Sequence, residues 1–179
     1  EPGAKGEGEP DLVMEDLEYV RVLDGRPVLR FQADRAERYE ASRTMQVADL
    51  RFEQFAAGTM ETDAVGQAAS ARIDLASGDA FLSGGVRVNV PGEELAIETA
   101  ELYWTDGERT LRGREDGPVL LKRSDGTAVS GIGFSADVRR RTWQFSGRVS
   151  GTYVEEEDQS GDAPAEAAAG AAPDYPEAP

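Results

Sequence analysis

The sequence predicts an all-β protein, a twisted β-jelly roll or open β-sandwich built from degenerate two-strand repeats of about 30 to 36 residues. Apolar and polar residues alternate in segment after segment, a pattern typical of strands with one buried face. No window keeps the i, i+3, i+4, i+7 spacing of an amphipathic helix. Charged or glycine-containing turns separate the alternating segments, so we expect antiparallel hairpins.

The repeat is clearest at 131–149, where a strand, a polar turn and a second strand follow one another. The same plan occurs at 33–52, 69–88 and 100–121. Each unit closes on an apolar residue that follows a Gly or Asp by one or two positions. At such lengths a unit holds two strands and their turns. The closing residues are Leu50, Val86, Val119 and Val149, at separations of 36, 33 and 30 residues.

Other strands are expected in order along the chain. Residues 11–22 alternate loosely and form a hairpin with the strand through Phe31, across a turn at 24–26. Between Val47 and Leu50 the alternation slips, as a β-bulge would cause. Later strands are expected around 71–75, 81–90, 95–104, 111, 119–121, 132–138 and 143–153.

Length and charge set limits on the domains and partners. The 179 residues carry a net charge of −16 and suit one domain with two tails. Residues 1–10 are predicted to be a flexible linker, and 155–179 a disordered acidic Ala/Pro tail that buries too little surface to fold. The domain between them, 11–154, holds 24 acidic and 18 basic residues. This mild acidity argues against nucleic acid as a partner, because nucleic-acid binders need a basic face.

Several kinds of chemistry are excluded or disfavoured by residue type. The chain has no Cys and no His, so disulfides, thiolate chemistry and nucleophile–His pairs are absent. Residues 131–136 fit G-x-G-x-x-A, yet the helix that a dinucleotide site needs does not follow, and glycine at tight strand packing is favoured. We therefore expect no enzyme, no catalytic residue and no cofactor.

The charged residues leave three narrower questions, on acid–base catalysis, metal binding and the binding of anions. The neighbouring carboxylates Glu93–Glu94 and Glu115–Asp116 fall in predicted turns, where acids are common, so acid–base catalysis is disfavoured. Metal binding is not expected, because nitrogen and sulfur ligands and calcium-loop spacing are missing. Arg139–Arg141 is the one concentrated cluster of cations. It is either a solvated turn or a contact for phosphates or carboxylates of a ligand or partner.

The apolar strand faces leave two architectures open. If the sheets pack tightly, they enclose a filled core, as in a structural or adaptor domain. If they splay apart, the faces line a groove for a long apolar ligand. A carbohydrate-binding or hydrolytic β-solenoid is a third possibility, but two Trp and five Tyr are too few for the aromatic ladders it needs.

Several sequence units resemble the lipopolysaccharide-export LptC family, with LptA/OstA-like modules as near neighbours. A Gly-x-Val ends strands at 84–86, 117–119 and 147–149. An Ala-Asp or Ala-Glu pair begins the next segment at 33–34, 100–101 and 136–137. The resemblance covers 11–154 and is carried by residues 29–39, 82–88, 98–103, 131–137 and 145–149.

The resemblance implies a periplasmic jelly roll that accepts lipopolysaccharide from an inner-membrane ABC transporter and passes it to an LptA-like bridge protein by edge-to-edge strand pairing. The acyl chains would lie between the sheets. The family usually carries an N-terminal membrane helix, and we expect a signal sequence or membrane anchor ahead of residue 1, a soluble start being the alternative. The acidic tail is not a feature of the family.

Residues of the expected conduit follow from the apolar face of each strand. The open edges are expected at 12–22 and 143–153, with Leu12, Met14, Tyr19, Val149 and Tyr153 as candidate partner contacts. The candidate lipid-lining residues are Leu29, Phe31, Val47, Phe52, Ile73, Phe81, Val86, Val88, Ile97, Trp104, Leu121, Ile132, Phe134, Trp143 and Phe145.

Overall fold

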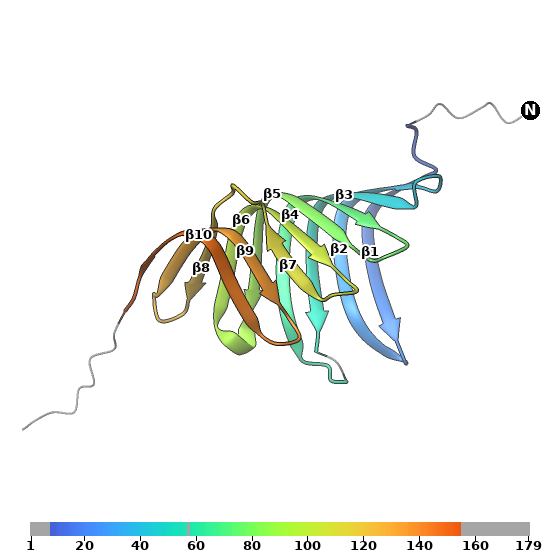
Figure 1. Ribbon diagram of the computed structural model, residues 1–179. Helices are drawn as coiled ribbons and strands as arrows, with labels where there is room; N and C mark the ends of the chain where they lie inside the picture. Colours follow the sequence, from blue (N-terminus) through green and yellow to red (C-terminus); the bar gives the residue numbers. More distant parts are fainter. Residues whose placement is uncertain (1–7, 57, 155–179) are drawn as a thin grey trace, which may run out of the picture.

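The computed structural model describes residues 8–56 and 58–154, and this part of the chain consists of strands and their turns (Figure 1). The expected linker is described only at residues 8–10, and the expected tail lies outside the described residues. One 3-10 turn, η1, spans Pro91–Glu93. The strands are β1 Leu12–Leu23, β2 Arg26–Tyr39, β3 Thr44–Phe55, β4 Thr62–Asp74, β5 Ala80–Val90, β6 Leu95–Thr105, β7 Thr110–Gly113, β8 Val119–Arg123, β9 Ala128–Asp137 and β10 Thr142–Thr152.

All described strands belong to one antiparallel sheet with the order β1-β2-β3-β4-β5-β6-β7-β9-β10. β7 and β8 occupy one position in that order, because both lie between β6 and β9. They are two pieces of a strand that is interrupted at 114–118. The sequence prediction of an all-β jelly roll made of successive hairpins is therefore confirmed.

A line of backbone irregularities crosses the sheet, and we call it the kink line. On β3 the inward-facing residues are Val47 and then Leu50, so the alternation slips between them, as the sequence predicted. The neighbouring strands slip at the same level, and the pairing register of β3 with β2 and β4 is unchanged across it. The slip on β3 is thus shared with β2 and β4, whereas on β5 and β10 the pairing register shifts at this level, as a bulge causes. Positive φ angles mark the line at Asp16, Asp49, Gly84, Gly85, Gly133 and Arg148.

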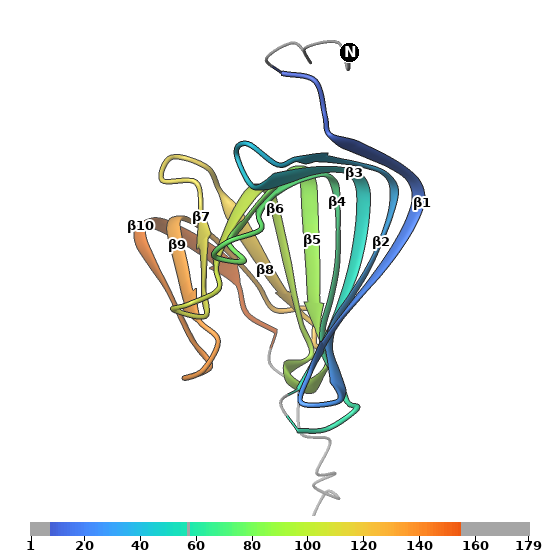
Figure 2. The ribbon, with the colours of Figure 1, turned by 90° about the vertical axis from the view of Figure 1, so that its right-hand side faces the viewer.

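The kink line divides each long strand into two halves and the sheet into two walls. Wall 1 comprises the halves that end at the turns 24–25, 58–61, 91–94 and 124–127, and wall 2 those that end at 40–43, 75–79, 106–109 and 138–141. We call the turns of each wall its rim. The strands curve strongly, and β7, β9 and β10 stand apart from the layer formed by β1 to β5 (Figure 2).

The buried core lies along the kink line and on the inner faces of both walls. Its most deeply buried large side chains are Val86 and Val119 in wall 1 and Leu102 in wall 2. Leu102 belongs to β6, whose wall 1 half pairs with β8 and whose wall 2 half pairs with β7. Apolar burial of this kind supplies most of the driving force for folding. The core thus joins the two walls near the kink line.

Candidate binding cavity and sheet edges

An apolar cavity of about 520 Å³ lies between the two walls, within the size range of ligand-binding pockets. Strand halves from both sides of the kink line contribute to it: β5 supplies Val88 from wall 1 and Leu82 from wall 2, and β6 supplies Ile97 and Leu102 in the same way. The cavity is therefore a product of the bend.

Nine of the fifteen predicted lining residues line this cavity. Another three, Val47, Val86 and Leu121, are buried in the core beside it, and Phe145 packs on that core and on Phe134, with ring centroids 5.5 Å apart. The nine cavity-lining residues are Leu29, Phe31, Phe52, Ile73, Val88, Ile97, Trp104, Phe134 and Trp143.

Two predicted lining residues, Phe81 and Ile132, belong neither to the cavity nor to the buried cluster, and for Phe81 the prediction was wrong. Leu82 is 6% exposed and faces the core, so alternation turns its neighbour Phe81 to the outer face. There the Phe81 ring packs on Tyr103, which is 43% exposed, with centroids 4.7 Å apart. On β5 the period of two from Leu82 to Val86 survives the kink line, because the pairing registers with β4 and β6 show that β5 carries one extra residue there, which offsets the slip.

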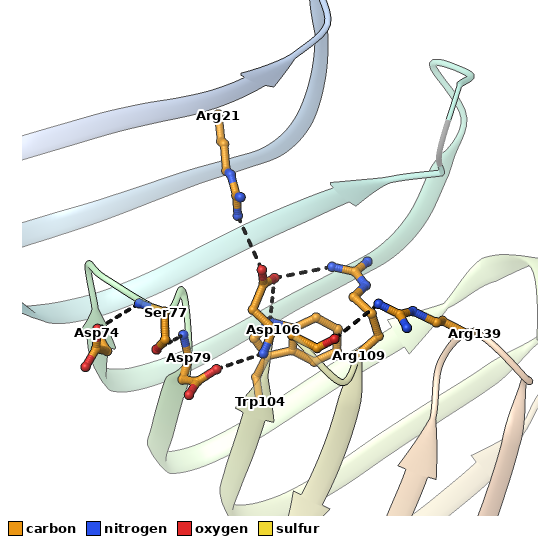
Figure 3. A network of polar contacts seen from close by, with 9 residues as sticks. Arg21, Asp74, Ser77, Asp79, Trp104, Asp106, Arg109 and Arg139 are labelled. Atoms are coloured by element: carbon orange, nitrogen blue, oxygen red, sulfur yellow. Dashed lines mark hydrogen bonds and ion pairs between the residues drawn. The ribbon is translucent and has the colours of Figure 1, made fainter.

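The rim of wall 2 carries a polar network centred on Asp106 in the β6–β7 turn (Figure 3). Its carboxylate accepts a 3.3 Å hydrogen bond from Trp104 Nε1 and lies 3.4 Å from Arg109 Nη1. The Arg109 guanidinium lies 4.7 Å from the centroid of the Trp104 ring. The Asp106 backbone N–H donates to Asp79 Oδ1 at 2.9 Å, and Arg21 approaches from β1 to 3.9 Å. The carboxylate is thus held at the cavity, which Trp104 and Arg21 also line.

The three consecutive arginines contact groups of the protein itself. Arg139 donates to the Gly107 carbonyl at 3.1 Å. Arg140 Nε lies 3.7 Å from Asp137, and Arg141 Nε lies 4.0 Å from Glu93. Arg139 and Arg141 also line the cavity, so this turn forms part of its rim.

Carboxylates with a shifted pKa are held in their ionised form. The backbone N–H groups of Ser77 and Ala76 lower the pKa of Asp74, and that of Thr127 lowers the pKa of Asp125. A hydrogen bond from Lys122 lowers the pKa of Glu98. A general acid at neutral pH requires the opposite shift, a raised pKa.

Within 8–56 and 58–154, no three His, Cys, Asp or Glu side chains are grouped to hold a metal ion.

The two ends of the sheet are open. Among the described strands, β1 pairs only with β2, and β10 pairs only with β9. Both predicted edges are therefore edges of the sheet, and they lie towards opposite ends of the molecule (Figure 1). Of the predicted contacts, Leu12, Val149 and Tyr153 are exposed, Val149 by 60%. Met14 instead packs on the core.

The remaining predicted contact, Tyr19, is 41% exposed and stacks on the cavity-lining ring of Phe31, with centroids 4.8 Å apart.

Within residues 8–56 and 58–154, the structure contains no helix that could span a bilayer.

Sequence comparison settles the family. Residues 2–154 match the family described as lipopolysaccharide-assembly, LptC-related. The chain belongs to the LptC family. As a member of this family of periplasmic proteins, the chain has a role in lipopolysaccharide transport. No curated protein sequence matches the chain.

A solved structure with the same fold is that of LptH, "the LptA homologous periplasmic component of the conserved lipopolysaccharide transport device from Pseudomonas aeruginosa". The TM-score is 0.53 at 12% sequence identity, over 71% of this chain and 95% of that chain. At this identity the likeness establishes the jelly-roll fold that the LptC-family chain shares with LptH.

Proposed function

We propose that this LptC-family chain is a passive lipid conduit, which accepts lipopolysaccharide from an inner-membrane ABC transporter and passes it to a neighbouring, LptA-like jelly roll. The observation that carries the proposal is the apolar cavity between the two walls. The free energy of acyl chains falls when such a surface removes them from water. In this proposal the chain acts in the periplasm, at the inner membrane from which the lipid comes.

The conduit needs no catalytic residue, because the transporter would supply the energy of transfer. The chain's part is to hold the acyl chains while their polar head remains outside. Edge-to-edge pairing of jelly rolls would align one cavity with the next, and the backbone groups of β1 and β10 are available for such pairing.

Site-specific photo-crosslinking in Gram-negative cells tests lipid contact. A photoreactive phenylalanine analogue at Trp104 would face the cavity, and the same analogue at the next residue, Tyr103, would face outwards. We expect a lipopolysaccharide adduct at Trp104 and none at Tyr103. A folded, exported protein without an adduct at Trp104 would instead be an adaptor domain with no lipid in its core.

Proline substitutions test the edges. Val149→Pro on β10 and Val20→Pro on β1 each remove a backbone donor from an exposed edge strand. We expect each variant to lose the neighbour bound at its own edge and to keep the other, as read by co-purification. Retention of both neighbours by both folded variants would exclude strand addition at these edges.

A further inference from the structure

Two ion pairs join the rims of the opposing walls. In the first, Arg21 near the rim of wall 1 lies 3.9 Å from Asp106 on the rim of wall 2. In the second, Glu93 of η1 on the rim of wall 1 lies 4.0 Å from Arg141 on the rim of wall 2. All four side chains line the cavity. We call these two ion pairs the clasp.

The first ion pair can form only because the sheet is bent. Arg21 and Asp106 lie at opposite ends of strands that are five positions apart in the sheet order. In a flat sheet, with strands spaced by 4.7–4.9 Å and a rise of about 3.3 Å per residue, they would be about 40 Å apart. Figure 3 shows Arg21 reaching from its strand across to Asp106. The pair therefore spans the gap between the walls on the side opposite the kink line.

The two sides of the first pair differ in how firmly they are held. Asp106 is fixed by Trp104, Arg109 and a backbone hydrogen bond to Asp79. Arg21 makes no other ion pair or side-chain hydrogen bond within the described residues. Arg141 likewise makes no ion pair or side-chain hydrogen bond in that part of the chain other than its pair with Glu93. Each pair thus has one arginine that is free to leave without breaking the rest of the rim.

Both ion pairs of the clasp are weak, because their arginine side chains are exposed to water. The Arg21 side chain is 47% exposed and that of Arg141 73%, so water and salt screen both pairs. An exposed pair of this kind changes an equilibrium by at most about fivefold. Along the kink line, by contrast, the walls are joined by the strands themselves and by the buried core. Separation is therefore easiest at the rims.

We propose that the clasp controls the entry of lipid into the cavity: the mouth is closed while the arginines pair with Asp106 and Glu93, and it opens when they are released. This proposal rests on the proposed function, since it concerns the same cavity. It adds the four residues that set the rate at which an apolar molecule passes between the rims.

A removable crosslink tests the proposal directly. The chain has no Cys, so Arg21→Cys/Asp106→Cys places two unique thiols on opposite rims, which a short bis-methanethiosulfonate bridges and a reductant releases. The control, Ser42→Cys/Ala76→Cys, bridges two turns of the same rim, which a backbone hydrogen bond from Leu75 to the Arg43 carbonyl joins, and neither residue lines the cavity. The readout is the stopped-flow uptake of N-phenyl-1-naphthylamine, a neutral apolar fluorophore.

We expect the cross-rim bridge to slow uptake at least tenfold, with recovery on reduction, and the same-rim bridge to leave it unchanged. Uptake that is equally fast with and without the cross-rim bridge would overturn the clasp alone. Equal slowing by both bridges would also overturn it. If the unmodified protein takes up no probe at all, the proposed lipid cavity fails and the clasp with it.

Charge variants provide a second test without a crosslink. Arg21→Gln/Arg141→Gln breaks both pairs, whereas Arg51→Gln/Arg72→Gln removes the same charge from exposed arginines that form no ion pair within the described residues. We expect the first double variant to take up the probe between about two and about twenty times faster. We also expect salt to accelerate uptake by the unmodified protein, because it screens the pairs, and to leave uptake by this variant unchanged. Unchanged uptake, or equal effects of both double variants, contradicts the clasp.

Discussion

The ring of Phe52 packs against the backbone of Gly66, its cross-strand partner on β4. A Cβ at Gly66 would collide with the ring and lie 3.0 Å from the carbonyl oxygen of Arg87. Phe52 lines the cavity, so the missing side chain at Gly66 sets how far this ring reaches into it.

Gly66→Ala is expected to push the Phe52 ring into the cavity and to destabilise the fold by about 1–3 kcal/mol, the usual cost of overpacking. Chemical denaturation measures the stability, and titration with an apolar fluorophore measures the cavity, whose affinity should fall. Gly107→Ala is the matched control, because a Cβ there meets nothing within 4 Å. A Gly66→Ala protein as stable as the control would show that the contact is not tight.

The inner and outer faces of β5 should respond differently to truncation. Leu82→Ala removes a buried side chain at the cavity and should cost about 2–5 kcal/mol of stability. Phe81→Ala removes an outer-face side chain that packs on Tyr103, and it should leave probe affinity unchanged. Loss of probe affinity in a folded Phe81→Ala variant would show that the Phe81 ring faces the interior.

The turn that follows Asp74 predicts that the stability of the fold falls at acid pH. Hydrogen bonds from the Ser77 and Ala76 backbone hold the pKa of Asp74 below its ordinary value of 3.8. The stability from this group is complete above that ordinary value and is lost as the pH falls through the lowered, folded-state pKa.

Thermal unfolding between pH 7 and pH 2 checks the prediction. Asp74→Asn keeps an acceptor for these bonds without the charge, so its stability should fall less steeply at the acid end. Asp34→Asn is the control, because Asp34 is exposed and makes no side-chain hydrogen bond within the described residues. Parallel acid profiles for the unmodified protein and Asp74→Asn would contradict the assignment.

Substitutions at two adjacent glycines on the kink line distinguish the cost of backbone strain from the cost of a steric collision. Gly84 and Gly85 have φ angles of +80° and +86°. An added Cβ costs roughly 1–2 kcal/mol in that region at either site. At Gly84 it would also lie 2.7 Å from Cβ of Ala69, whereas at Gly85 it meets nothing within 4 Å. Chemical denaturation should therefore rank Gly84→Ala below Gly85→Ala in stability, and the reverse order would refute the bend as described.

The repeat seen in the sequence has a physical cause in the kink line. Leu50, Val86 and Val119 are the first inward residues of wall 1 after the kink, and all three are buried. The Gly or Asp before them lies at the kink, where Asp49 and Gly85 have positive φ. The fourth closing residue, Val149, occupies the same place on β10 but is 60% exposed, because an edge strand has no further neighbour.

Local signals were enough for the hairpins. The polar turns predicted inside the four units, at 40–43, 76–79, 106–109 and 139–141, are all turns, and all lie on the rim of wall 2. Turn chemistry and a period of two act over a few residues, so a single sequence displays them. The same signals identified β1 and β10 as the first and last strands and nine residues that line the cavity.

The sequence by itself determined the strands, their turns, the order of hairpins and the family, because each depends on short-range patterns or on recurring motifs. The tertiary structure decided which halves of the sheet oppose each other, and so the cavity and the ion pairs from Arg21 to Asp106 and from Glu93 to Arg141. Those contacts join residues 85 and 48 positions apart in the sequence. They arise from the shared bend of the sheet, which no local pattern measures.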